Sequence, residues 1–148
     1  KKHCNVELEQ KVLQLKPIST ILNNTRRNFS TTVSNDGLVS CSDGFPSLAP
    51  PGVLLTRGKW YYEVTIVNPG LAQLGWADTR FTADSTNGNG VGDDSFSWGF
   101  DGHRVLKWHK GSSRWGRPWS EGDVIGFYAD LDSCKLSFSI NGDCTSPL

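Results

Sequence analysis

Between Gly90 and His109 the chain places three aspartates and two histidines within twenty residues. Carboxylates and imidazoles are the side chains that most often bind metal ions or transfer protons. This stretch is therefore the first candidate for a metal site or a catalytic centre. Whether its side chains can act together depends on the strands and turns that hold them.

Distance excludes a metal site shared by the two histidines. His103 and His109 lie six residues apart on one predicted strand, so at ~3.4 Å per residue they are about 20 Å apart. Asp93 and Asp94 would point to opposite faces of a strand, and Asp101 is expected in a turn. No calcium-loop pattern of alternating carboxylates is present. The sequence predicts no metal and no cofactor.

Other catalytic patterns are also missing. The glycine-rich residues 88–92 lack the Gly-Lys-Ser/Thr ending of a phosphate-binding loop and open no helix. No Gly-x-Ser-x-Gly elbow presents a nucleophilic serine. The sequence leaves open an acid pair for glycoside hydrolysis, because such carboxylates come from distant strands. We interpret the acidic residues as turn caps that face water, and we predict that the protein is not an enzyme.

Length and charge limit the remaining classes. A chain of 148 residues suits one domain. Fifteen Lys and Arg balance fifteen Asp and Glu, which argues against a nucleic-acid partner or an anionic membrane. The longest apolar run, residues 53–55, is far shorter than the ~20 residues of a membrane span. We expect a soluble domain with no membrane insertion.

The cysteines indicate a reducing compartment. Cys4, Cys41, Cys134 and Cys144 are irregularly spaced and form no Cys-x-x-Cys pair, so neither a zinc knuckle nor a redox motif is present. We expect reduced thiols and a cytoplasmic location.

The elements that must position these residues are strands. From residue 58 onward apolar and polar side chains alternate with a period of two, as in residues 59–67, 124–131 and 136–140. Asp101-Gly102 predicts a type I′ hairpin turn, and Asn141-Gly142 is a second turn signal. Turn residues about every ten positions favour an all-β fold, a two-sheet antiparallel β-sandwich.

The less regular parts of the chain are a short helix candidate and the tryptophans. Only residues 6–16 indicate a helix, which Pro17 would end. Four tryptophans at alternating strand positions are predicted to fill the core; they are Trp60, Trp76, Trp98 and Trp108. For Trp115, in a loop, core and contact roles are equally open.

Six segments, in order, resemble one known family. They read GKWYYEV (58–64), QLGWA (73–77), GVGDD (90–94), SWGFDG (97–102), WSEGDVIG (119–126), and DLD (130–132) with LSFSING (136–142). This series resembles the successive signatures of a SPRY domain. Asp101-Gly102-His103-Arg104 with Trp119 is most similar to the subgroup found in large ubiquitin ligases and ryanodine receptors.

The resemblance implies a protein-interaction module without catalysis of its own. Residues 1–28 would be an N-terminal extension and residues 29–148 the SPRY domain. Relatives that capture peptides use loops at one end of the sandwich. Transferred to this sequence, the partner-binding residues would be Asp43, Phe45, Gly70, Leu71, Arg80, Phe81, Asn87 and Asn89.

Three functions remain in competition. The leading hypothesis is an adaptor that binds a partner protein or short peptide, with recruitment for a ubiquitin ligase as one use. The second is a lectin-like glycan-binding module, since lectins share this sandwich shape. Such lectins place acidic and asparagine ligands around calcium in their loops, and Asp84, Asn87 and Asn89 resemble such a set. The third is an architectural domain of a large multidomain protein, which would show a broad apolar outer patch.

The end of the chain carries one more expectation. SPRY relatives continue beyond Asn141-Gly142 with further strands, so we expect an incomplete sandwich here. Either residues 6–29 supply the missing edge or later strands are absent, and we favour the second interpretation because residues 6–16 alternate poorly. An open edge would promote self-association, and the burial of Leu136, Phe138 and Ile140 is its test.

Overall fold

The computed structural model describes residues 31–34, 36–42, 44–50 and 52–144. It divides the chain into two compact units, residues 1–54 and 55–148. The helix expected at residues 6–16 lies outside the described residues. Among the residues that are described there is no helix.

The first unit contains a small hairpin. Strands β1 (Thr31–Val33) and β2 (Val39–Cys41) pair in antiparallel fashion. Ser34 shapes the turn, because its carbonyl accepts from Gly37 N at 3.0 Å and its Oγ accepts from Leu38 N at 3.0 Å. The hairpin is thus closed by local hydrogen bonds to a serine, a residue with high turn propensity.

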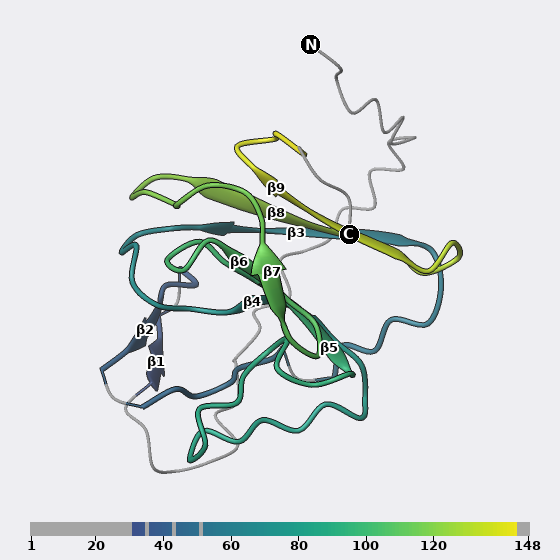
Figure 1. Ribbon diagram of the computed structural model, residues 1–148, viewed down its shortest axis with the longest axis horizontal. Coiled ribbons are helices and arrows are strands. Elements are labelled where there is room, and N and C mark those ends of the chain that lie inside the picture. Colours follow the sequence, from purple (N-terminus) through teal and green to yellow (C-terminus); the bar gives the residue numbers. More distant parts are fainter. Residues whose placement is uncertain (1–30, 35, 43, 51, 145–148) are drawn as a thin grey trace. The chain divides into compact units, whose positions relative to one another are not determined.

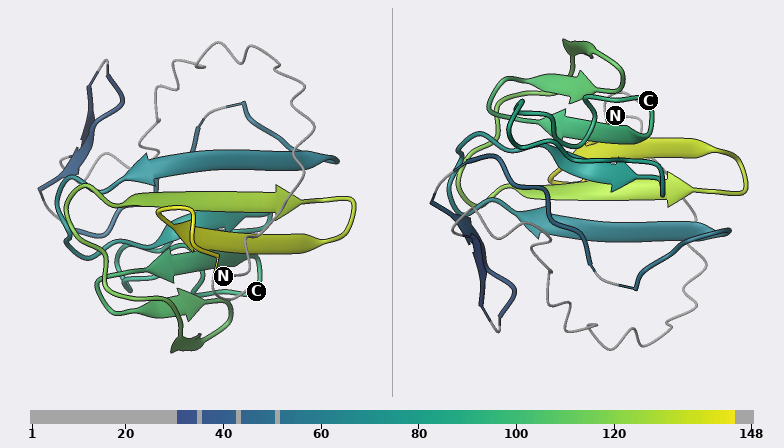
Figure 2. Two further views of the ribbon diagram at one scale, coloured as in Figure 1. Left: turned by 90° about the horizontal axis from the view of Figure 1, so that it is seen from above. Right: turned by 90° about the horizontal axis from the view of Figure 1, so that it is seen from below.

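The second unit holds two antiparallel sheets (Figures 1 and 2). The first has the order β3-β8-β9, with β3 (Lys59–Thr65), β8 (Val124–Asp130) and β9 (Lys135–Ile140). The second has the order β4-β5-β6-β7, with β4 (Leu74–Ala77), β5 (Ser97–Asp101), β6 (Leu106–Trp108) and β7 (Ser112–Arg114). The prediction of an all-β antiparallel sandwich is confirmed.

Aromatic and branched side chains from both sheets form the core. Phe127 of β8 lies opposite Phe138 of β9 in the register, and their rings are 5.2 Å apart. The ring centroids of Phe100 on β5 and Phe138 on β9 are 6.2 Å apart. This contact packs the second sheet against the first. Tyr62 of β3 stacks on Phe127 at 4.6 Å. These rings remove a large apolar area from water, the main stabilising contribution in such a sandwich.

The prediction that the strand tryptophans fill the core is correct for Trp76 and Trp98, which pack against it, and wrong for Trp60. Trp60 lies on the inward-facing side of β3 but is 37% exposed, and its Nε1 donates to Arg57 O at 2.8 Å. Trp115 and Trp119, outside the strands, are only 5% and 4% exposed. Trp115 packs edge-on against Phe100 at 4.7 Å. Alternation determines which face of a sheet a side chain lies on. Burial also requires another strand or loop packed against that face.

The hairpin after Asp101 exists, but its predicted turn type is wrong. Residues 102–105 connect β5 to β6, and the positive φ of 60° falls at Val105. The Asp101 side chain is fully buried and accepts from His103 N at 2.8 Å and from Arg104 N at 3.1 Å. Arg104 Nε also donates to it. The prediction that this carboxylate faces water is therefore wrong, since three donors replace its hydration.

The turn after β9 follows the prediction. Asn141 and Gly142 have φ values of 51° and 77°. Ile140 and Asp143 exchange two backbone hydrogen bonds, of 3.1 and 3.0 Å. Two central residues with positive φ between a bonded pair make a type I′ turn.

The sequence predicts an open sheet edge at β9. Phe138 and Ile140 are 1% and 5% exposed, whereas Leu136 is only half-buried. Among the strands of the described chain, β9 pairs with β8 on one side and has no partner on the other. Self-association through this edge stays a prediction.

Candidate functional site

The long connection between β4 and β5, residues 78–96, is held in place at its base. Asp78 N donates to Phe96 O at 2.8 Å. The Asp78 carboxylate accepts from Arg80 N at 2.7 Å and from Arg80 Nη2 at 2.5 Å. These hydrogen bonds from Arg80 hold the pKa of Asp78 below its ordinary value. The Arg80 guanidinium lies over the Phe96 ring at 4.3 Å, with 69% of the side chain exposed. Arg80 is thus a solvent-facing cation in a fixed orientation.

The tip of this connection is a small closed turn. Asp84 and Asn89 exchange backbone hydrogen bonds of 3.0 and 2.8 Å. The Asp84 carboxylate accepts from Thr86 N at 3.1 Å and from Asn87 Nδ2 at 2.6 Å. The Asn87 amide therefore maintains the loop, whereas the Asn89 side chain is exposed. Phe81 is half-buried at the start of the same loop.

Asp93 and Asp94 brace the return of this loop to β5. Asp93 Oδ2 accepts from Gly90 N at 2.7 Å, and Asp94 Oδ1 accepts from Ser97 Oγ at 2.6 Å. Gly92 has a φ of 102°, and a Cβ there would be 2.4 Å from the Trp108 Cβ, so only glycine fits. The carboxylates of the opening stretch thus serve the fold. In the part of the chain that is described, no three metal-ligating side chains gather.

The two histidines contact different parts of the backbone. His103 is in the 102–105 connection, with Nδ1 at 3.3 Å from Pro69 O. His109 follows β6, with Nδ1 at 2.9 Å from Ser97 O and its ring stacked on Trp98 at 4.8 Å. The expectation that both lie on one strand is wrong, because β6 covers only Leu106–Trp108. They sit instead before and after that strand.

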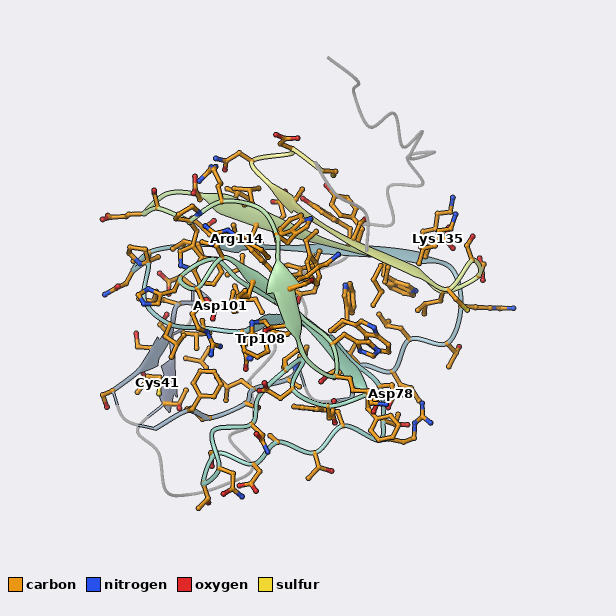
Figure 3. All side chains as sticks on the ribbon, viewed as in Figure 1. Cys41, Asp78, Asp101, Trp108, Arg114 and Lys135 are labelled. Atoms are coloured by element: carbon orange, nitrogen blue, oxygen red, sulfur yellow. The ribbon has the colours of Figure 1, made fainter. Side chains whose placement is uncertain are left out.

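The sequence-predicted binding residues fall into separate groups. Gly70 and Leu71 precede β4, whereas Arg80, Phe81, Asn87 and Asn89 follow it. The two groups therefore leave β4 from its opposite ends. In Figure 3 Asp78, just past β4, and Asp101, the last residue of the antiparallel β5, mark these two ends. Phe45 belongs to the first unit, and Asp43 lies outside the described residues.

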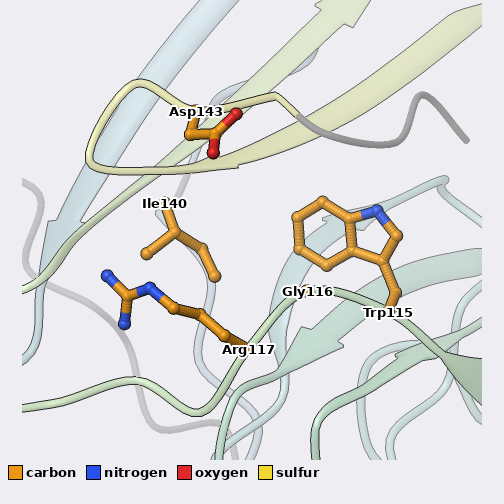
Figure 4. A pocket seen from close by; sticks show the side chains of 5 residues that line it. All are labelled: Trp115, Gly116, Arg117, Ile140 and Asp143. Atoms are coloured by element: carbon orange, nitrogen blue, oxygen red, sulfur yellow. The ribbon is translucent and has the colours of Figure 1, made fainter.

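A second feature near the end of β9 was not expected from the sequence. A pocket of about 190 Å³ is lined by Trp115, Gly116, Arg117, Ile140 and Asp143 (Figure 4). Its apolar wall is continuous with the core, since Trp115 and Ile140 are each 5% exposed. No motif signals it, because the lining residues come from two segments far apart in the chain.

An ion pair fixes one side of this pocket. Arg117 donates to both carboxylate oxygens of Asp123, at 2.7 and 3.0 Å. Asp123 also accepts from Ser120 N and Asn141 Nδ2, each at 2.8 Å. The hydrogen bonds from Arg117, followed by that from Ser120, hold the pKa of Asp123 well below its usual range. With its guanidinium committed to Asp123, Arg117 ties its loop to the residue that directly precedes β8.

Among the described residues, no helix has the length and apolar character that crossing a membrane requires.

Comparison with known proteins gives a consistent result. Residues 59–147 match the SPRY domain. The chain is 42% identical over 96 residues to E3 ubiquitin-protein ligase RKP of Arabidopsis thaliana, which covers 65% of this chain and 7% of that protein. It is 33% identical over 88 residues to ATP-dependent RNA helicase DDX1 of Xenopus laevis, covering 60% of this chain and 11% of that protein. The chain thus spans a small part of the length of these relatives. With two antiparallel sheets and a family match over more than half its length, the chain belongs to the SPRY domain family of protein-interaction modules.

Proposed function

We propose that this SPRY domain recruits a partner protein or short peptide through the 78–96 loop, with Arg80, Phe81, Asn87 and Asn89 as the binding residues. The observation that carries the proposal is the fixed, solvent-facing Arg80, held by Asp78 and by the Phe96 ring. A rigid loop loses less conformational entropy on binding than a flexible loop does. Long loops braced on a sandwich are also where binding residues concentrate.

Each residue of the loop has a distinct role in this proposal. Phe81 supplies the apolar anchor, because partly buried aromatic side chains dominate the affinity of many interfaces. Arg80, whose Nε and Nη2 are bonded to Asp78, offers its remaining guanidinium donors to a hydrogen-bond acceptor of the partner, and the exposed Asn89 amide offers a donor and an acceptor. Asn87 contributes less, since its amide already bonds to Asp84 at 2.6 Å.

Recruitment for ubiquitin transfer is the finer function that we propose. The support is the 42% identity to a protein named as an E3 ubiquitin-protein ligase. In this proposal the SPRY domain selects the protein to be modified, and other domains of a longer polypeptide carry out the chemistry. Cys134 is an exposed free thiol, which supports a reducing, cytoplasmic setting.

A quantitative capture experiment tests the loop surface. The full chain is immobilised, exposed to cell extract, and its captured proteins are compared by mass spectrometry with those captured by variants. Proteins that bind the loop should be lost with Phe81→Ala and Arg80→Glu and kept with Asn87→Ala. Leu71→Ala, at the opposite end of β4, is the matched control and should capture the same set. Equal capture by all four variants would contradict the proposed site.

Affinity of the purified chain for a captured partner gives the magnitude. Truncation of an anchoring aromatic costs about 2 kcal/mol or more, roughly thirtyfold in Kd. Asn87→Ala should change Kd by less than about threefold, because its amide is turned to Asp84 and the backbone hydrogen bonds between Asp84 and Asn89 still close the turn without it. Equal small effects of the two substitutions would argue against a focused site.

A further inference from the structure

Positive charge is concentrated in one segment of a chain that has no net charge. Residues 102–120 contain five of the fifteen Lys and Arg and no Asp or Glu. Two of the five are neutralised by ion pairs, Arg104 with Asp101 and Arg117 with Asp123. In the described structure, three cations of this segment form no ion pair; they are Lys107, Lys110 and Arg114.

These three cations lie on or next to β7, an outer strand of the four-stranded sheet. Arg114 is on β7, Lys107 is on the paired strand β6, and Lys110 is in the turn between them. Within the described chain β7 pairs with β6 on one side and with nothing on the other. Two backbone hydrogen bonds flank this pair, from Trp115 N to Val105 O at 3.2 Å and from His109 N to Gly111 O at 2.9 Å. They determine which residues of β7 face β6.

The alternation of an antiparallel ladder then assigns the outer edge. Ser113 lies opposite Lys107 and bonds to β6, because the flanking bonded pairs are two residues away on each side. The N–H and C=O of Ser112 and Arg114 consequently point away from the sheet. The edge therefore presents two donors and two acceptors in the spacing of a strand.

The cations lie on both faces of this edge. Residues paired across an antiparallel ladder share a face, so Lys107 lies on the face of Ser113, and Arg114 lies on the other face with Leu106. Lys110, at the turn between the strands, is exposed. On one face, side chains of an added strand would meet Arg114 directly; on the other they would meet Lys107, which reaches from β6 across the small Ser113. Figure 3 labels Arg114 on β7 and Trp108 on the adjacent β6.

We infer that the β7 edge is a second binding surface, distinct from the 78–96 loop, and that it takes an extended acidic peptide segment as an added strand. Its outward N–H and C=O groups match a peptide backbone, which alternates acceptors and donors in the same way. Its unpaired cations match carboxylates at successive positions of the added strand.

Two other occupants fit less well. A second copy of β7 would bring Lys107 and Arg114 of both chains together, and like charges placed side by side repel. Single-stranded RNA carries phosphate groups, and proteins bind it by stacking its bases on exposed aromatic rings. Here Arg104 covers the Trp108 ring at 4.4 Å, and Trp115 is 5% exposed. The edge therefore favours an acidic peptide.

The probe for a first test is a short fluorescein-labelled peptide in which glutamate alternates with valine, capped at both ends. Fluorescence anisotropy with the full chain should show saturable binding that weakens with salt. Lys107→Glu and Arg114→Glu should each weaken binding about fivefold at low salt. Lys135→Glu, an exposed cation on β9, is the matched control and should bind as the unchanged chain does. Equal binding by all three variants would overturn the inference.

The strand pairing is tested separately from the charge. Ser112→Pro removes one outward N–H and keeps the bonds to β6, and proline is tolerated on edge strands. A peptide N-methylated at alternate residues keeps its charges but loses its edge donors. Either change should reduce affinity at least about tenfold. If Ser112→Pro lowers the melting temperature, the N-methylated peptide decides alone.

The remaining outcomes are equally decisive. Undiminished binding of the N-methylated peptide would mean adsorption by charge only, and tighter binding of a labelled oligouridylate would mean an RNA site. Either result overturns the inference. Phe81→Ala, in the loop surface proposed above, should leave peptide affinity unchanged, so the two surfaces can fail independently.

Discussion

Replacing Gly102 with alanine should destabilise the second unit through one steric contact. A Cβ at this position would lie 2.4, 2.5 and 2.6 Å from three ring atoms of Trp119. Trp119 is 4% exposed and packs edge-on against Phe100 at 5.6 Å, so its ring cannot swing into water without opening the core. The φ of Gly102 is not in the left-handed region, and the effect is therefore steric and not a backbone effect.

The magnitude follows from the cost of overpacking. Forcing an extra methyl into a packed core costs about 1 to 3 kcal/mol. For a unit of this size each kcal/mol lowers the melting temperature by about 4 to 8 °C. Gly102→Ala should therefore lower the melting temperature by roughly 4 to 24 °C. Tryptophan fluorescence during thermal unfolding measures this directly, because Trp119 itself changes environment.

Two controls isolate the contact. Gly70→Ala makes the same substitution where the nearest atom, Asn68 Oδ1, would be 3.7 Å away, and it should leave the melting temperature unchanged or slightly raised. Trp119→Phe combined with Gly102→Ala should lose less stability than the sum of the two single changes, because both act on one contact. A Gly102→Ala protein that melts like the unchanged chain would refute the reasoning.

Two further predictions concern carboxylates. The pKa of Asp123 is depressed in the folded state, mainly by the hydrogen bonds from Arg117, so its contribution to stability is present above the ordinary aspartate pKa near 4 and is lost as the pH falls below that value. Thermal melts of Asp123→Asn and the unchanged chain should differ most at neutral pH and converge in acid; a constant difference at all pH values would contradict this. Because the Asp84 carboxylate already accepts hydrogen bonds from Thr86 and Asn87, millimolar calcium should not raise the melting temperature; a rise that grows with calcium concentration would instead favour the lectin-like hypothesis.

Periodicity in the sequence was sufficient to predict the three strands of the first sheet, β3, β8 and β9, but not β7, which lies in a stretch without alternation. Tyr62 and Val64 alternate with Tyr61 and Glu63, and the structure packs the first two against the core and exposes the others. The Asn141-Gly142 turn was equally predictable, because few residues adopt two successive positive φ values. Both signals are local, and local signals are the ones that a single sequence reports best.

Burial depended on contacts between distant segments and could not be predicted in the same way. Trp115 and Trp119 lie in a polar stretch, yet both are part of the core because both pack against the Phe100 ring. Trp115 also packs against Phe138. Asp101 precedes glycine as in a two-residue turn, but its carboxylate caps the backbone of His103 and Arg104. That capping lengthens the connection, and nothing in the Asp-Gly pair reports it.

The positions of the predicted binding residues at the two ends of β4 follow from the order of strands and loops along the chain. Gly70 and Arg80 flank a strand of four residues, and loops on either side of one strand leave it from opposite ends. This consequence was available from the sequence once β4 had been recognised. The bracing of Arg80 by Asp78 and Phe96 was not available, because Phe96 lies sixteen residues away along the chain.

The most direct test of the proposed interaction surface is amide hydrogen exchange of the chain with and without a purified partner from the capture experiment. Binding through the 78–96 loop predicts slowed exchange at residues 79–92, with the 66–73 connection at the other end of β4 unchanged. Protection confined to residues 66–73, or absent from residues 79–92, would contradict the account.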